Sequence, residues 1–138
     1  MSTLLSYRLA AIVLVIVLCG TLALAQELDA PWLLGTWQGT SPSPRGQGQE
    51  DRRTLIFREG GRFTGDIQSV RGGLIQVSGT YKIEGKELLL EGIYDQAPQA
   101  IRGAKFTYSL KRAGDALEGT AYSHATGLTI PVSLKKDK

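Results

Sequence analysis

The side chains of this sequence that could do chemistry are few and scattered. His124 is the one histidine and Cys19 the one cysteine, so no His/Cys cluster has the spacing of metal ligands. Nucleophilic catalysis needs a base beside its nucleophile and a further group that orients the base. His124 falls in a predicted turn without such a partner. We therefore predict no catalytic residue, no metal site and no cofactor.

Two pairs of carboxylates could in principle do acid–base work on a glycan. Glu87 and Glu91 occupy alternate positions of one predicted strand and share its polar face. Glu50 and Asp51 are neighbours in a predicted loop, where solvation is the simpler interpretation. The Arg71-Gly72-Gly73 segment has the glycines of a phosphate loop, but no helix follows it, which favours a hairpin turn. The sequence therefore predicts a protein that is not an enzyme.

The N-terminal segment has the three parts of a cleavable secretory signal. Arg8 supplies a positive charge, residues 9–18 form an apolar run, and Ala23-Leu24-Ala25 offers small residues to a signal peptidase. We predict cleavage after Ala25, which leaves residues 26–138 as one secreted or periplasmic domain. Two alternatives are an uncleaved membrane anchor, for which the apolar stretch is short, and a lipid on Cys19, which lacks a small residue before it.

The charge of the chain gives no reason to expect a nucleic-acid partner. There are 16 Lys and Arg against 13 Asp and Glu, and the net charge of +3 falls to +2 if Arg8 leaves with the signal. Arg45, Arg52 and Arg53 lie close together near one loop, and we interpret them as solvated surface residues. We expect no integral membrane span once the signal is cleaved, and no disulfide, since Cys19 leaves with it.

Alternation of apolar and polar residues with a period of two dominates the chain after Ala25. Each alternating run has one polar and one apolar face, which is typical of a half-buried antiparallel sheet. Glycine-containing turns separate the runs, and two longer connections span residues 41–52 and 94–103. After a first strand at 37–40, the runs lie at 54–59, 62–68, 74–84, 88–92, 105–111, 117–121 and 128–135.

Eight strands joined by short turns predict an all-β, antiparallel up-and-down barrel, and the alternative is a β-sandwich. Gly65, Gly79, Gly92 and Gly119 fall in the middle of strands on the apolar face. Glycine at such positions weakens a strand but permits the strong coiling of a small barrel. These glycines therefore favour closure.

The segment that contains Gly35 and Trp37 resembles the start of lipocalin-like barrels, which open with a Gly-x-Trp signature. The segment Ser78-Gly79-Thr80-Tyr81-Lys82-Ile83 is similar to sequences of the small bacterial members of this calycin-type group. The resemblance implies a barrel that encloses a small apolar ligand and is closed at one end by the tryptophan. Family members often pack an arginine over that tryptophan. Here the last strand ends in Lys135-Lys136, and Arg112 lies two strands earlier.

An eight-stranded barrel has an interior that side chains just fill or that holds one small ligand. Our first hypothesis is an exported, non-catalytic barrel that binds a small, mostly apolar molecule, with Tyr81 and Tyr108 as its polar groups. The second is a filled barrel that binds an envelope protein through the 41–52 and 94–103 loops. Six aromatic residues are predicted to line the interior: Trp37, Phe57, Phe63, Tyr81, Phe106 and Tyr108.

Overall fold

The computed structural model describes residues 28–43, 48–69 and 73–137. The predicted signal at residues 1–25, with Cys19, lies outside the described residues, as do Arg45 and most of the predicted turn at 71–73. One short helix, α2 (Ala30–Leu33), precedes the strands. The strands are β1 (Gly35–Pro42), β2 (Glu50–Arg58), β3 (Arg62–Gln68), β4 (Leu74–Glu84), β5 (Glu87–Gln96), β6 (Lys105–Ala113), β7 (Ala116–Ser123) and β8 (Thr129–Lys136).

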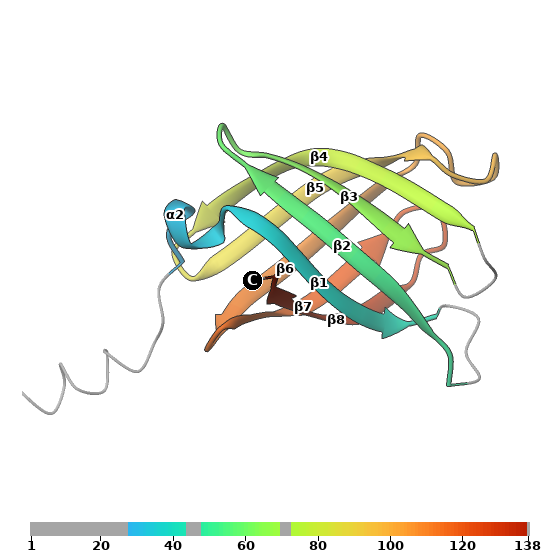
Figure 1. Cartoon of the computed structure of the whole chain (residues 1–138). Coiled ribbons are helices and arrows are strands. Elements are labelled where there is room, and N and C mark those ends of the chain that lie inside the picture. The colour runs from blue at the N-terminus through green and yellow to red at the C-terminus, as the bar shows by residue number, and fades with distance from the viewer. Residues whose placement is uncertain (1–27, 44–47, 70–72, 138) are drawn as a thin grey trace, which may run out of the picture.

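The eight strands form one closed antiparallel barrel (Figure 1). Each strand pairs with its neighbours in sequence, and β1 also pairs with β8, where Trp37 lies opposite Lys136. Closure removes the exposed edges that an open sheet would present. The predicted up-and-down barrel is confirmed, and the sandwich alternative is wrong. The architecture is compatible with a lipocalin-like fold.

The two ends of the barrel differ. The closed end carries α2 together with the turns β2–β3, β4–β5 and β6–β7, and the open end carries the other four connections (Figure 1). The connections predicted at 41–52 and 94–103 are shorter in the structure. The strand β1 continues to Pro42, β2 begins at Glu50 and β5 continues to Gln96. The Pro, Ser and Gly content near residue 42 hid the strand pattern there.

Burial alternates along the strands as the sequence predicts. In β2, for example, Leu55 and Phe57 are buried and their neighbours are more exposed. Burial of these side chains stabilises the fold by about 1.5–3 kcal/mol for each large apolar residue. These side chains form one apolar core inside the barrel. It contains Leu28, Leu33, Trp37, Leu55, Phe57, Phe63, Ile67, Val77, Leu88, Leu90, Phe106, Tyr108, Leu110, Leu117, Ala121, Val132 and Leu134.

The strands β4 and β5 approach each other closely at a pair of glycines. Gly79 lies opposite Gly92 in the register of these strands. A Cβ atom on Gly79 would lie 2.1 Å from the carbonyl oxygen of Glu91 and 2.6 Å from the Cα atom of Gly92. The mid-strand glycines thus allow backbone contacts that a side chain would prevent.

The closed end is built on Trp37, which is fully buried. Its indole Nε1 donates a hydrogen bond of 2.8 Å to the carbonyl of Leu33, the last residue of α2. The helix begins at a cap in which Asp29 accepts a hydrogen bond of 2.8 Å from the backbone N–H of Trp32. The short helix thus brings a carbonyl group to a tryptophan that would otherwise bury an unsatisfied donor.

Two cations cover this end of the barrel. The Arg112 guanidinium lies 3.9 Å from the centre of the Trp32 ring, and Trp32 itself packs edge-on against Trp37 at 4.9 Å. Lys136 donates a hydrogen bond of 2.7 Å to the carbonyl of Trp32, and its Nζ lies 6.0 Å from the Trp37 ring. The resemblance implies an arginine packed over Trp37, whereas Arg112 stacks on Trp32.

Candidate functional site

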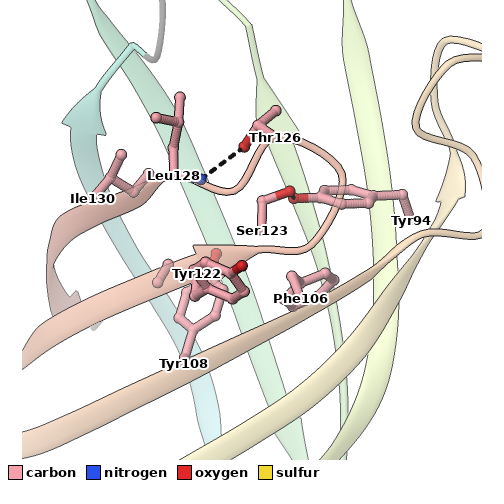
Figure 2. Close-up of a pocket in the computed structure, with 9 residues that line it drawn as sticks. Tyr94, Phe106, Tyr108, Tyr122, Ser123, Thr126, Leu128 and Ile130 are labelled. Carbon is pink, nitrogen blue, oxygen red and sulfur yellow. Dashed lines mark hydrogen bonds between the residues drawn. The ribbon is translucent and has the colours of Figure 1, made fainter.

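A small pocket lies at the open end, between the ends of β5, β6, β7 and β8 (Figure 2). Its volume is about 30 Å³, which is room for one or two water molecules. Figure 2 shows Tyr94 and Ser123 side by side at the pocket, where the Tyr94 hydroxyl donates a hydrogen bond of 3.1 Å to the Ser123 hydroxyl, and the turn that carries Thr126 passing over the pocket. The lining residues are Tyr94, Phe106, Tyr108, Ala121, Tyr122, Ser123, Thr126, Leu128 and Ile130.

Larger hollows also occur on the outer wall of the barrel. One of about 430 Å³ lies over β4, β5 and β6. Thr80, Lys82 and Glu91, which line it, are exposed polar residues. Most of its lining side chains lie on the solvent face of these strands, whereas the lining of the pocket at the open end comes mainly from the inner face. The pocket at the open end is therefore the better candidate.

The structure brings five of the six predicted interior aromatics into one chain of ring contacts. Tyr81 and Phe57 lie 5.3 Å apart, Phe57 and Phe63 6.3 Å, Phe63 and Phe106 6.2 Å, and Phe106 and Tyr108 5.5 Å, each measured between ring centres. This chain runs along the interior from the closed end to the pocket. Phe106 and Tyr108 are the two members that line the pocket.

The other predicted aromatics lie away from the pocket. Trp37 is part of the closed end, in contact with Trp32. Tyr81 is half-buried and donates a hydrogen bond of 2.7 Å to the carbonyl of Arg58, at the last residue of β2. The hydroxyl of Tyr81 is therefore hydrogen-bonded to the backbone at the closed end of the barrel.

Tyr94 is a pocket residue that the sequence analysis assigned to a loop. It lies on β5 and packs against Phe106, with 5.1 Å between the ring centres. The signal was present in the sequence, because Leu88, Leu90, Gly92 and Tyr94 continue the same alternation. Ser123 and Ile130 also line the pocket, at the end of β7 and the start of β8.

Arg53 is the largest departure from the sequence analysis. We interpreted it as a solvated residue, but it is buried, with 7% of its surface exposed. Its Nε donates to the hydroxyl of Ser41 at 2.6 Å, and its Nη1 donates to the hydroxyl of Tyr108 at 2.5 Å. Arg53 shares its strand face with Leu55 and Phe57, so the alternation of β2 could have revealed it.

The bond between Arg53 and Tyr108 crosses the interior of the barrel. Arg53 lies on β2 and Tyr108 on β6, which are four strands apart in the closed order of eight. The side chain of Arg53 therefore spans from one wall to the opposite wall. It joins the pocket residue Tyr108 to Ser41 of β1, which is 1% exposed.

The candidate acid–base residues are not gathered into one site. Glu50 is exposed and Asp51 is buried, so these neighbours point to opposite faces of β2 and not into a loop. On β5, Glu87 accepts a hydrogen bond of 3.0 Å from the Ser109 hydroxyl. His124 is exposed in the β7–β8 turn, where its ring packs edge-on against Tyr122 at 4.9 Å.

Burial raises the pKa of the Tyr108 phenol above its ordinary value of 10.0, and the nearby charge and hydrogen bond of Arg53 only partly oppose this. Above about pH 10 the unfolded chain loses this proton while the folded barrel keeps it, so stability falls as the pH rises. We expect wild-type protein to lose stability more steeply than Tyr108→Phe, by up to about 1.4 kcal/mol per pH unit. Urea unfolding between about pH 8 and pH 11 measures the difference.

The control for this experiment is Tyr122→Phe, which removes the hydroxyl of an exposed residue. This variant should keep the alkaline slope of the wild type. Equal slopes for wild type and Tyr108→Phe would contradict the prediction.

Residues 28–43, 48–69 and 73–137 include no group of three or more His, Cys, Asp or Glu side chains placed to hold a metal ion. Within the same residues no helix has the length and apolar character needed to cross a bilayer.

Comparison with protein-family models and with curated proteins found no match to this chain.

Proposed function

We propose that this chain is an exported, lipocalin-like barrel that binds one small, mostly apolar molecule at its open end without converting it. The observation that carries the proposal is the pocket between Tyr94, Phe106 and Ile130, which is mainly apolar and has a few hydroxyl groups. The signal-like residues 1–25 support export to the periplasm or the exterior.

The pocket has to enlarge before it can hold a ligand. Its volume of about 30 Å³ is well below the roughly 300–1,000 Å³ of pre-formed small-molecule sites. The segment over it, residues 124–129, is exposed throughout. Opening this segment exposes little additional apolar surface, and it breaks backbone hydrogen bonds such as the one from the His124 N–H to the Lys105 carbonyl, 3.0 Å. We infer that the β7–β8 turn moves aside when the ligand enters.

Apolar side chains at the open end support an apolar ligand. Leu74 is 53% exposed at the start of β4, and Leu128 is 45% exposed just before β8. Ile93 and Tyr122 are also exposed and lie in the halves of β5 and β7 nearest this end. Exposed apolar residues that lie around one end of a fold often mark a ligand or partner site.

Binding of N-phenyl-1-naphthylamine, a neutral apolar dye that fluoresces when buried, tests the proposal. We expect saturable binding to the purified domain. Ala121→Leu should weaken it by about tenfold or more, because the added carbons occupy the pocket and ligand contacts are lost. Fluorescence titration measures both affinities.

The matched control is Thr120→Leu, which adds an apolar side chain to the exposed face of β7, one position before Ala121. It should leave dye binding unchanged. Equal affinities for Ala121→Leu and the wild type would place the dye elsewhere and contradict the proposal.

The filled interior favours a second candidate function. The core leaves little free space at the closed end, where Leu33, Trp37 and Leu117 have no exposed surface. A filled barrel could bind an envelope protein through its open-end loops, which include residues 97–104. A well-folded domain that binds no apolar dye would favour this function over ligand binding.

A further inference from the structure

The ladder that closes the barrel covers only part of β1 and β8. These two strands pair over four residues, and the last pair toward the open end is Thr40 with Ser133. In the described part of the chain, the other neighbouring strands pair over seven residues or more. Beyond the last pair, β1 continues along β2 to Pro42, and β8 lies along β7 back to Thr129. The seam between β1 and β8 is therefore unpaired toward the open end.

A pair of prolines explains where the ladder stops. In an antiparallel pair, backbone groups exchange hydrogen bonds at every second residue. The Asp137 N–H donates to the Thr36 carbonyl at 2.8 Å, so Thr36 and every second residue after it point their backbone groups toward β8. In this register the first such pair that is missing is Pro42 with Pro131. Neither proline has an N–H, so neither hydrogen bond of that pair can form.

The paired and unpaired parts of the seam differ in the space between the strands. In the paired part, a Cβ atom on Gly39 would overlap the carbonyl of Ser133, so the two backbones are in close contact. At the unpaired part lies a hollow of about 360 Å³, and its lining includes Pro42 of β1 and Pro131 of β8. The prolines thus lie where the two strands separate.

The unpaired part of β8 also borders the pocket. Ile130 lines the pocket and packs against the core, and Val132 is buried, with 3% of its surface exposed. Pro131, between them, is exposed. A single strand, β8, therefore lies between the hollow outside the barrel and the pocket inside it.

Widening of the seam at this place breaks no backbone hydrogen bond between β1 and β8. At the other seams, the ladder holds neighbouring strands together over a longer stretch. The β7–β8 turn is continuous with the unpaired part of β8, so movement of the turn and widening of the seam are one motion. Bonds within the hairpin, such as that from the Ser123 N–H to the Leu128 carbonyl at 3.1 Å, are kept.

We propose that the barrel opens sideways between β1 and β8, and that the apolar ligand enters the pocket through this gap. This inference rests on the proposed function and says how its site is reached. Pro42 and Pro131 prevent the seam from pairing, and the pair of Thr40 with Ser133 is the pivot. Proline at an exposed edge also prevents pairing with a strand of another protein, which favours entry of a ligand over docking of a peptide.

Amide hydrogen exchange tests the open seam in the wild-type protein without any ligand. The Ser133 N–H faces β1 in the last pair of the short ladder, whereas the N–H of its neighbour Val132 faces β7 inside a longer ladder. After correction for intrinsic rates, we expect Ser133 to exchange at least about tenfold faster than Val132, because local opening begins where few contacts hold the backbone. Equal protection of the two amides would overturn the open seam.

The double variant Pro42→Thr/Pro131→Thr tests the route. It restores both missing N–H groups with a residue that favours strands, so the ladder should extend by one pair and exchange at Ser133 should slow. Association of N-phenyl-1-naphthylamine should slow by about tenfold or more, because two hydrogen bonds, each worth roughly a factor of five, must break before each entry. Stopped-flow fluorescence measures the association rate.

Pro98→Thr serves as the control. Pro98 is an exposed proline of the β5–β6 connection at the same end of the barrel, and its carbonyl accepts from the Arg102 N–H at 3.1 Å. Threonine keeps that carbonyl, so this variant should change neither the exchange of Ser133 nor the association rate. A similar slowing in Pro98→Thr would contradict a specific role of the seam.

The outcomes separate this inference from the proposed function. If exchange at Ser133 slows in the double variant but the dye associates at the wild-type rate, the route is wrong and the apolar site stands. If the dye does not bind to the wild type, the proposed function and the route both fail, and exchange still decides whether the seam is open. If the double variant does not fold, each single variant restores one donor and should slow association about fivefold.

Discussion

Replacing Gly79 with alanine is expected to lower the free energy of unfolding by about 3 kcal/mol, at the upper end of the usual cost of overpacking. The added Cβ would lie 2.1 Å from the carbonyl oxygen of Glu91 and 2.6 Å from the Cα of Gly92. Both atoms belong to the backbone of β5, so no side-chain rotation relieves the contact. For a domain of this size the loss corresponds to a fall in Tm of roughly 12 °C or more.

The matched control is Gly73→Ala, at the residue before β4 begins. A Cβ atom on Gly73 would meet no atom within 4 Å, so this variant should unfold close to the wild-type temperature. Thermal unfolding followed by circular dichroism at about 218 nm, the usual β-sheet signal, compares the two variants. If Gly79→Ala is as stable as Gly73→Ala, β4 and β5 do not approach each other as closely as we describe.

Replacing Trp37 with alanine is expected to destabilise the barrel by about 3–5 kcal/mol, the usual cost of deleting a buried aromatic ring. Trp37 has no exposed surface, and its indole donates to the Leu33 carbonyl at 2.8 Å. Removal of the ring leaves a cavity under α2 and deprives that carbonyl of its donor. The closed end should therefore open first, and α2 should detach from the barrel. Urea unfolding followed by circular dichroism measures the loss.

Two further variants divide this loss into its parts. Trp37→Phe keeps an aromatic ring but removes the hydrogen bond. Loss of that bond alone should lower the free energy of unfolding by about 1–2 kcal/mol. Trp32→Ala deletes the half-buried ring under Arg112 and should cost less than Trp37→Ala. Because the chain has two tryptophans, Trp32→Ala also leaves Trp37 as the sole indole emitter. A solvent-exposed emission spectrum from that variant would contradict the burial of Trp37.

The strand pattern was largely predictable from the sequence because its cause is local. Side chains alternate between two faces of a strand, and a barrel makes one of those faces apolar. The runs near Ile75 and Phe106 therefore indicated strands directly, and glycines such as Gly85, with a φ of 62°, marked the turns between them. The end of β1 beside Pro42 was missed because the Pro, Ser and Gly residues there are typical of loops, whereas the end of β5 was missed although the alternation continues to Tyr94.

The candidate site was less predictable, for a geometric reason. Alternation places Arg53 and Tyr108 on the inner face, but it does not say that β2 and β6 stand opposite each other at the distance that one arginine spans. Composition near the loop therefore suggested a solvated arginine. Only closure of β1 onto β8 sets the width of the interior and brings the two side chains together.

The order of neighbouring residues is enough to specify eight antiparallel strands with an apolar inner face, because the alternation of side chains along a strand is a local property. The tertiary structure alone decided how much space the inner face leaves. The free volume is the small difference between the volume that the strands enclose and the combined volume of the side chains inside it, including Phe63, Phe106 and Tyr108. That difference depends on how the whole chain packs, and it leaves a pocket beside Tyr94 and Ile130 at one end.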